Sequence, residues 1–579
     1  MREPLMQHLP LFIPNTLQRV REDTELQKLA AKMAHHAPGS PPLGEHVERT
    51  DFPSVSEASF YTCYSHEVSP ATRARHADRN SYDRDDLPRH NDAHMHPWSY
   101  IQKGIGLKEL VLRMKMINCM TSVVMPIPTS IIPLQGDKAY KHYELMKIPG
   151  GLHHCGPRYY LPAEFNHRGV TLTPEILACA VSAATLSLDT EVDDHTADEF
   201  KQLEPDEQNV LDPMITGLHL GSTRADFALF KKLARNPGVF TGGGELTFNK
   251  ELVEHMFERD GQASLHPVPY IARHNGGDTN IEPAKQLMAA FGVAGMPVCL
   301  HCDIDDWIPD KDGNPKNLAA FSAFIGDTKV RDTKIIWAHA GGLGRFVKQS
   351  KGHLNALEDM LALHPNLVLD IAWSEVARQL TGVDLPINEA RLRVSQWTEF
   401  LEKHSSRIMF GSDSLAPKSN QHWSQTLIAY KDLLRGLSAE ARLNVLEKSY
   451  ETHIKGARDA VRKFENHVLP FMRDKLCDFS TLRLDIPAIR IFRDALYSRM
   501  KSTEVCTTRT FDHHEISQAN ERLELRQMLG KKILENASKG RRIEELEALL
   551  EAQRGGASGS QRGRSSVSTP KKPNSKPWY

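Results

Sequence analysis

The sequence lacks an excess of charge of either sign. Lys and Arg together number 72 and Asp and Glu 73, so the formal net charge is -1. A balanced chain has no overall field with which to hold nucleic acid or an anionic membrane surface. We therefore expect a small-molecule substrate as the partner, with no nucleic acid and no membrane.

Long apolar runs are also missing. No stretch reaches the roughly 18 consecutive apolar residues of a spanning helix. The N-terminal segment has an early arginine, but Pro4, Pro10 and Pro14 interrupt it before a secretory apolar region can form. The eight cysteines are scattered, without the regular spacing of a disulfide scaffold or the paired CxxC motifs of zinc knuckles. These absences predict reduced thiols and a cytoplasmic location.

The composition is that of a soluble globular protein. Hydrophobic residues make up 40% of the chain and charged residues 25%, which is enough apolar material for a sizeable core. The chain has 579 residues, more than an ordinary domain, yet single barrels range from about 200 to over 400 residues. One barrel with appendages therefore fits the length, and two domains would fit it too.

Repeated βα units begin near His90. Residues 1–88 show one helix-like piece at 16–35 and no core pattern, so we interpret them as an N-terminal arm. Beyond them, short apolar runs ending in polar residues alternate with longer amphipathic stretches, which is typical of a parallel sheet. We predict an α/β fold, a (β/α)8 TIM barrel, in residues 89–450. The expected strand ends are His96, Ile127, His219, Glu245, His301, His339, Ile371 and Asp413.

Two parts of the chain do not fit this alternation. Residues 128–211 exceed a normal crossover helix, so we predict an inserted helical cap, with a helix at 174–188, over the face where loops build the site. After the barrel we predict a helical extension at 451–553 and a disordered basic tail at 554–579. The extension is a candidate interface for a homo-oligomer. Helix-like patterns cover 425–437, 439–464 and 515–552.

The run RHNDAHMHPW carries the sharpest chemical signal. Side chains alternate across a strand, so His94 and His96 point to one side and Met95 to the other. Two imidazoles then converge from one strand end, as a pair of metal ligands does. His-x-His is a short pattern, however, and chance is the alternative in a chain with 28 histidines.

Three more polar residues stand where apolar strands stop. His301 follows the apolar run in MPVCLHCD, His339 ends KIIWAH, and Asp413 follows RIMFGS. Barrel enzymes place catalytic groups at such strand ends, and the glycines after His339 let backbone approach closely. A lone buried histidine is usually a satisfied core residue. Together with the paired histidines of the first strand, these residues predict a metal site instead.

The ordered set DAHMH, LHCD, AHAGG and FGSD, spread over residues 90–450, resembles the amidohydrolase superfamily. The likeness is strongest to the amidohydrolase-related branch of metal-dependent hydrolases, which also includes decarboxylases. The sequence departs from that family at residues 450–451, where an Asn-Ala pair is common, and this concerns the closure of the barrel and not the site. The metal ligands that the resemblance implies are His94, His96, His301, His339 and Asp413.

Glu245, in VFTGGGELTFNKE, ends the expected fourth strand. In several relatives a carboxylate or a carboxylated lysine bridges two metals here, so the resemblance implies that Glu245 is a bridging ligand. The alternative is a glutamate that hydrogen-bonds a ligand or a loop. Lys250 lies beyond the strand end and fits a bridging role less well.

The predicted cofactor is a divalent metal, one or two Zn2+ ions, because zinc suits histidine nitrogen and carboxylate oxygen ligands. Mn2+ or Fe2+ could replace it, since such a ligand set selects poorly among them. Water on zinc titrates at roughly pH 7, so hydroxide becomes the nucleophile. Asp413 would accept the water proton and pass it to the leaving group, while His339 or the metal polarises the scissile carbonyl. His301 is a metal ligand or a second carbonyl polariser. The predicted activity is hydrolysis of an amide, ester or lactone-type bond in a small molecule.

Two other functions stay open. Relatives with the same ligand types use one metal for nonoxidative decarboxylation of small carboxylic acids. A non-enzyme alternative is a scaffold that binds partners through its C-terminal helices, although an intact ligand set argues against a degenerate barrel.

Three residues beyond the strand ends are candidates for substrate binding. Asp303 trails His301, Trp373 follows the seventh strand, and Arg273 lies in the long connection between the fourth and fifth strands. The alternatives are a solvated acidic turn, a buried tryptophan and a surface loop. Specificity in this fold depends on loop shapes, so the sequence predicts no particular substrate.

Overall fold

The computed structural model divides the chain into a unit of residues Met1–Gly530 and a second of residues Lys531–Tyr579. Several predictions fall outside the described residues: the strand ends Ile127 and His219, the helix at 174–188, Arg273, and the basic tail. The described residues are 22–35, 87–99, 103–126, 129–130, 156–157, 191–218, 220, 225–249, 281–305, 315, 317–344, 347–415, 417, 419–472, 483–500 and 511–524.

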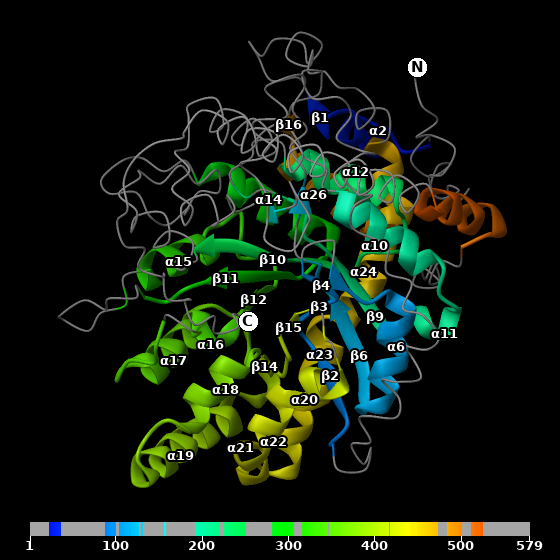
Figure 1. The fold of residues 1–579 in the computed structure, drawn as a ribbon. Coiled ribbons are helices and arrows are strands. Elements are labelled where there is room, and N and C mark those ends of the chain that lie inside the picture. Colours follow the sequence, from blue (N-terminus) through cyan, green and yellow to red (C-terminus); the bar gives the residue numbers. More distant parts are fainter. Residues whose placement is uncertain are drawn as a thin grey trace, which may run out of the picture. The chain divides into compact units, whose positions relative to one another are not determined.

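Eight parallel strands form the central sheet (Figure 1). Their spatial order follows their order in the chain, which is the arrangement that successive βα units produce. All their carboxyl ends therefore meet at one edge of the sheet. The strands are β2 (His90–Asp92), β6 (Cys119–Val124), β9 (Leu211–Ile215), β10 (Gly242–Asn249), β11 (Val298–Cys302), β12 (Ile335–Trp337), β13 (Leu367–Asp370) and β14 (Ile408–Met409).

The first and last strands, β2 and β14, stand at the two edges of this sheet, and the segments that follow them pair with each other. Strand β3 (Met95–His96) lies parallel to β15 (Ser414–Leu415). The Ala93 N–H donates to the Phe410 carbonyl at 3.0 Å, and the Asp413 N–H donates to the His94 carbonyl at 2.7 Å. These backbone bonds bring the beginning and the end of the predicted barrel together at the site.

Helices separate the strands, as the alternating pattern predicts. They follow the strands as α6 (Leu107–Met116), α12 (Ala225–Arg235), α14 (Glu282–Ala294), α15 (Leu318–Ile325), α17 (His353–Leu363), α18 (Ser374–Thr381), α19 (Ile387–His404) and α20 (Asn420–Ala429). Before β9 come α10 (Glu191–Lys201) and α11 (Pro205–Gln208), and short strands lie at β4 (Trp98–Ser99), β5 (Lys103–Gly104), β7 (Thr129–Ser130) and β8 (Gly156–Pro157).

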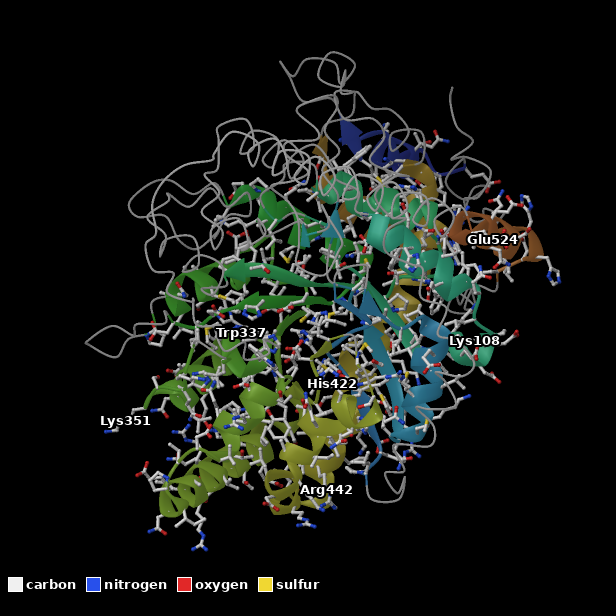
Figure 2. The ribbon with its side chains drawn as sticks, viewed as in Figure 1. Lys108, Trp337, Lys351, His422, Arg442 and Glu524 are labelled. Atoms are coloured by element: carbon white, nitrogen blue, oxygen red, sulfur yellow. The ribbon has the colours of Figure 1, made fainter. Side chains whose placement is uncertain are left out.

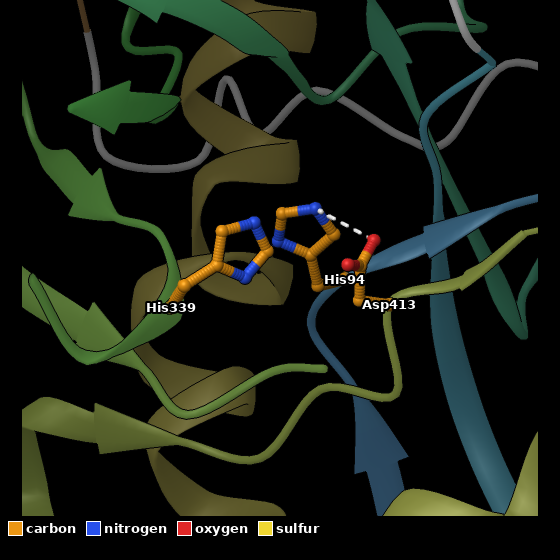
Figure 3. Close-up of side chains that lie close together, drawn as sticks. All are labelled: His94, His339 and Asp413. Atoms are coloured by element: carbon orange, nitrogen blue, oxygen red, sulfur yellow. Dashed lines mark ion pairs between the residues drawn. The ribbon is translucent and has the colours of Figure 1, made fainter. Parts of the chain in front are cut away.

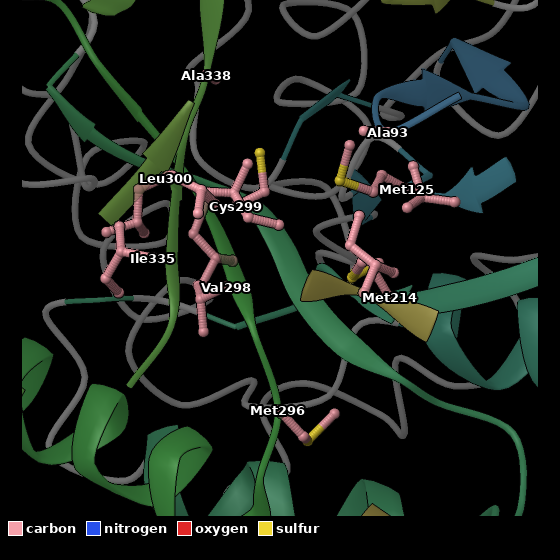
Figure 4. Close-up of a cluster of buried hydrophobic side chains, with 14 of the residues drawn as sticks. Ala93, Met125, Met214, Met296, Val298, Cys299, Leu300, Ile335 and Ala338 are labelled. Atoms are coloured by element: carbon pink, nitrogen blue, oxygen red, sulfur yellow. The ribbon is translucent and has the colours of Figure 1, made fainter. Parts of the chain in front are cut away.

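The core lies on the strands themselves. Every residue of β11, β12 and β13 is buried, as expected for a parallel sheet covered on both faces. Val298, Cys299 and Leu300 of β11 pack in an apolar cluster with methionines from neighbouring elements (Figure 4). Trp337 of β12 lies inside the molecule, whereas Lys351 lies at the periphery (Figure 2).

The N-terminal arm and the C-terminal extension pack on each other. Helix α2 (Thr24–Ala31) contacts α26 (Ile486–Arg499), and β1 (Ala34–His35) pairs antiparallel with β16 (Arg483–Leu484). The sequence predicted a helical piece here but no core pattern. The structure differs, because Leu26 and Met33 are buried in the main hydrophobic core.

The predicted helix at 439–464 is broken into shorter pieces. A π-helical turn at Asn444–Lys448 and a 3-10 turn at Lys455–Ala457 interrupt it. The helices in this region are α21 (Lys431–Gly436), α22 (Ala439–Leu443), α23 (Ser449–His453) and α24 (Arg458–His467). Among the described residues, no helix combines the length and the apolar character needed to cross a bilayer.

Candidate metal centre

Six side chains that the sequence singled out meet at the carboxyl ends of the strands. They come from the first, fourth, fifth, sixth and eighth strands or from the residues directly after them, and all six are at least largely buried. They are His94, His96, Glu245, His301, His339 and Asp413.

The Glu245 carboxylate lies between four imidazoles. Its Oε2 is 3.8 Å from Nε2 of His94 and 3.7 Å from Nε2 of His96. Its Oε1 is 2.6 Å from Nδ1 of His301 and 3.4 Å from Nε2 of His339. Each oxygen therefore faces one pair of histidines, so this carboxylate divides the cluster into two halves.

Asp413 completes the half that contains the first-strand histidines. Its Oδ1 is 3.1 Å from Nε2 of His96 and 3.6 Å from Nε2 of His94. Figure 3 shows Asp413 and His339 on either side of His94. Burial alone would raise the pKa of Asp413, but the hydrogen bond from His96 and the neighbouring imidazoles lower the pKa to about 2. The carboxylate is therefore ionised at neutral pH.

Three of the imidazoles are held by their outward nitrogens. Nδ1 of His96 is 2.6 Å from the Met125 carbonyl oxygen, and Nδ1 of His94 is 3.0 Å from Oδ2 of Asp370. Nε2 of His301 is 2.8 Å from Oδ1 of Asp303. A carbonyl or carboxylate oxygen accepts a hydrogen bond, so each contact favours a ring N–H on the outward nitrogen and would leave the lone pair of the other nitrogen for a cation at the centre.

These donors fit a divalent cation. Three subsets place their ligand atoms within 4.8 Å of one another: His94, His96 and Glu245; Glu245, His301 and His339; and His94, His339 and Asp413. The buried Nε2 of His94 has no hydrogen-bond partner, although an unsatisfied buried nitrogen is costly. Imidazole nitrogens with carboxylate oxygens are ligands that zinc and similar transition metals accept.

The backbone takes unusual conformations where two of these side chains leave their strands. His339 has φ 62° and Asp413 has φ 48°, in the left-handed region that few non-glycine residues adopt. After His339, Gly342 has φ 75°, and a Cβ added to it would lie 2.2 Å from the Cys302 carbonyl oxygen. The glycine pair expected to allow close backbone approach therefore does so at Gly342.

Burial and charge act differently on two of the histidines. Burial by itself would lower the pKa of His94. The Asp370 carboxylate outweighs this effect and raises the pKa of His94 well above its ordinary value. For His339, burial dominates and lowers the pKa. Asp370 thus favours the charged form of His94, and burial favours the neutral form of His339.

The predicted substrate-binding residues lie in different surroundings. Asp303 is buried against the outward nitrogen of His301, where it can orient that ring. The Trp373 ring is 5.5 Å from the His339 ring, beside the centre. Arg273 lies outside the described residues.

Two buried carboxylates near the site were not found by sequence reasoning. Asp370 contacts His94, and Asp92 accepts from the Ser412 hydroxyl and the Trp423 indole. Asp370 ends the apolar run LVLD, so the rule that found His301 and His339 could have found it too.

No protein-family model and no curated protein matches the sequence. Solved structures of amidohydrolases and related enzymes do match it, each at low identity. A probable 2-pyrone-4,6-dicarboxylic acid hydrolase from Acinetobacter baumannii is 10% identical, with 63% of this chain and 99% of that chain covered and a TM-score of 0.32. A zinc-bound amidohydrolase from Burkholderia multivorans is 11% identical over the same shares, with a TM-score of 0.32.

A 5-carboxyvanillate decarboxylase from Sphingomonas paucimobilis is 10% identical, with 63% of this chain and 99% of that chain covered and a TM-score of 0.30. Likeness at this level carries no conclusion about activity.

Proposed function

We propose that this protein is a metal-dependent hydrolase of the amidohydrolase type that cleaves an amide, ester or lactone-type bond in a small molecule. The observation that carries the proposal is the Glu245 carboxylate, which has imidazole nitrogens of two histidine pairs on its two oxygens. A carboxylate in this position is suited to bridge two cations, which is a recurrent arrangement in metal-assisted hydrolysis.

We assign the cofactor as two Zn2+ ions in two subsites that share Glu245. In the first subsite, His94, His96 and Asp413 would hold an ion together with Glu245. In the second, His301 and His339 would do so with the same carboxylate. The ligand types support this assignment, since zinc accepts both imidazole and carboxylate.

We also propose that the sheet closes as a (β/α)8 barrel. The parallel pairing of β3 with β15 and the Asp413-to-His94 backbone bond support closure between the first and eighth strands. The inserted cap over the site, the cytoplasmic location and a homo-oligomer stay predictions.

A divalent metal bound here would lower the pKa of a bound water to roughly 7 and so supply hydroxide at neutral pH. The residues of the chain then have distinct tasks. Asp413, ionised and beside His96, is placed to accept the proton of an attacking water and to return it to the leaving group. His301 and His339 line the opposite side of Glu245, where they can hold the second cation or polarise the scissile carbonyl.

The decisive experiment combines metal analysis with product analysis on the full-length protein. We expect about two equivalents of zinc and hydrolysis of members of an ester, lactone and amide panel, without release of CO2 from carboxylic acid substrates. One equivalent of metal with CO2 release would instead identify a decarboxylase. A protein that takes up no metal would contradict both.

A further inference from the structure

Asp370, the last residue of β13, contacts two of the proposed metal ligands without facing the centre itself. Its Oδ2 lies 3.0 Å from Nδ1 of His94. Its Oδ1 accepts the backbone N–H of His339 at 2.8 Å and that of Ala372 at 3.0 Å. Both oxygens are engaged, and the side chain has 0% exposed surface.

We propose that Asp370 is a positioning residue that orients one ligand of each metal subsite, an inference that rests on the proposed function. Through Oδ2 it fixes the ring plane of His94 and places the N–H of that ring outward. Through Oδ1 it fixes the start of the loop that carries His339. One carboxylate thus sets a ligand of the first subsite and a ligand of the second.

The loop that carries His339 has a backbone conformation that the hydrogen bond to Asp370 helps to hold. His339 has φ 62° and Ala340 has φ 50°, and left-handed backbone of this kind persists only where the surroundings fix it. The bond from the His339 N–H to Asp370 acts at the first of these residues. The Ala338 N–H, which donates to the Leu300 carbonyl at 3.0 Å, ties the residue before it to β11.

Asp303 offers a matched comparison within the same site. It too is a buried carboxylate against an outward imidazole nitrogen, at 2.8 Å from Nε2 of His301. His301 belongs to the second subsite alone. Loss of the Asp303 carboxylate should therefore affect one subsite, whereas loss of Asp370 should affect both.

A direct metal ligand is the competing role for Asp370, because His94, Cys299 and Asp370 also group closely enough to hold an ion. The Cys299 sulfur lies 3.8 Å from Nδ1 of His94 and 3.9 Å from Oδ2 of Asp370. The oxygens of Asp370, however, are already taken up by the imidazole and two backbone N–H groups. A Cys299→Ala variant separates the two roles.

The test uses Asp370→Asn and Asp370→Ala in the full-length protein. An asparagine can keep the backbone bonds through its oxygen, but its NH2 then faces Nδ1 of His94 and favours the ring form with the proton on Nε2, which cannot bind a metal there. Loss of a residue that orients a ligand typically weakens metal binding about 10- to 100-fold. We expect a loss in that range at the first subsite for Asp370→Asn and at both subsites for Asp370→Ala.

Zinc affinities are measured by titration of the metal-stripped protein against a competing chelator, and the ligand field by the absorption spectrum of the Co2+-loaded protein. Asp303→Asn should weaken one site, and Cys299→Ala should leave both affinities within about twofold of the unmodified protein. Unchanged zinc affinities and an unchanged Co2+ spectrum in Asp370→Asn would overturn the inference, as would loss of zinc in Cys299→Ala.

A measurement on the unmodified protein covers the case in which the Asp370 variants do not fold. In the zinc-loaded protein labelled with 15N-histidine, NMR should show the His94 proton on Nδ1, and a proton on Nε2 would refute the proposed role. If the unmodified protein binds no zinc, the proposed function fails, which is distinct from failure of the Asp370 inference.

Discussion

His96 shows most simply how one side chain joins the backbone to the centre. Its Nδ1 is held by the Met125 carbonyl, and its Nε2 lies 3.1 Å from Asp413. Replacing it with alanine removes one inward nitrogen and leaves the strand pairing intact. We therefore expect His96→Ala to lose most bound metal and activity while its circular dichroism spectrum stays that of the unmodified protein.

His513→Ala is the matched control for this change, because His513 is exposed on the helix at 513–524. It should retain full metal content by elemental analysis. Unchanged metal content in His96→Ala would refute the ligand assignment.

The sequence could identify the six site residues but not every contact that orders them. His94, His301 and the others can be recognised in the sequence because each polar residue interrupts or ends an apolar run. Asp370 ends such a run as well, in LVLD, but the sequence does not show that it meets His94, since the two residues lie 276 residues apart in the chain. Only the folded sheet shows which carboxylate meets which imidazole.

Among the elements, the turn after β12 is the most constrained. Gly342 has φ 75°, and a Cβ there would lie 2.2 Å from the Cys302 carbonyl oxygen and 2.5 Å from the Asp303 Cα. Both atoms belong to backbone that cannot swing aside. We expect Gly342→Ala to lower the free energy of unfolding by at least about 2 kcal/mol, as measured by denaturant titration.

Gly352→Ala provides the control, since a Cβ at Gly352 meets nothing within 4 Å. Gly352→Ala should change the free energy of unfolding by no more than about 0.5 kcal/mol. Equal stability of the two variants would show that the turn relaxes more freely than its contacts indicate.

Helix α12 contains a buried acid whose titration should affect stability. Burial raises the pKa of Asp226 from its ordinary value of 3.8 to about 6. The folded state therefore holds this proton more tightly than the unfolded chain does. Stability from this group is fully present below about pH 4 and is lost as pH rises through about 6, by up to roughly 3 kcal/mol.

Chemical denaturation from pH 4 to pH 7 checks this prediction. The quantity to follow is the difference in the free energy of unfolding between the unmodified protein and Asp226→Asn. Asp226→Asn should lack the loss of stability with rising pH. Asp359→Asn, on the exposed side of α17, controls for the removal of a carboxyl group. A difference that does not change across this range would contradict the prediction.

The strands themselves were predicted well, and their ends less well. Apolar runs located β11, β12 and β13, yet β12 ends at Trp337 and β14 at Met409, before the polar residues expected to end them. At His339 and Asp413 the backbone turns through positive φ. This is a property of the loop geometry, and the apolar pattern of the strand does not contain it.

At the scale of the whole molecule, the C-terminal extension helps to hold α10 in place. The Arg522 guanidinium contacts both oxygens of the buried Asp198 at 2.6 to 3.1 Å. Phe511 lies 6.2 Å from Phe200, ring to ring, and 5.9 Å from the Lys201 ammonium. The helix at 513–524 is thus part of the folded unit and not an independent appendage.

Truncations on either side of this helix should therefore behave differently. Ending the chain after Gly555 or after Gly530 should leave turnover and metal content intact, because both truncations keep every described residue of the site and of the helix at 513–524. Ending it after Met500 removes the Arg522 contact and should lower the melting temperature. Arg522→Ala should reproduce part of this destabilisation. It should lower the free energy of unfolding by about 1 to 2 kcal/mol, after allowance for the 41% exposed Arg522 side chain.

Calorimetry measures the melting temperatures of the truncated proteins and of Arg522→Ala. A large fall in kcat on removal of residues 556–579 alone would show that the tail acts on the site.

The pairing of the segments that follow the first and last strands sets the order in which the site can be built during synthesis. Asp92 and Ser412, hydrogen-bonded to each other, are 320 residues apart in the chain, and Asp413 follows directly. A ribosome that has released only the first half of the protein presents the His94 and His96 pair without Asp413. Metal capture by the complete centre must therefore wait until the eighth strand has emerged and docked, so it belongs to the last stage of folding.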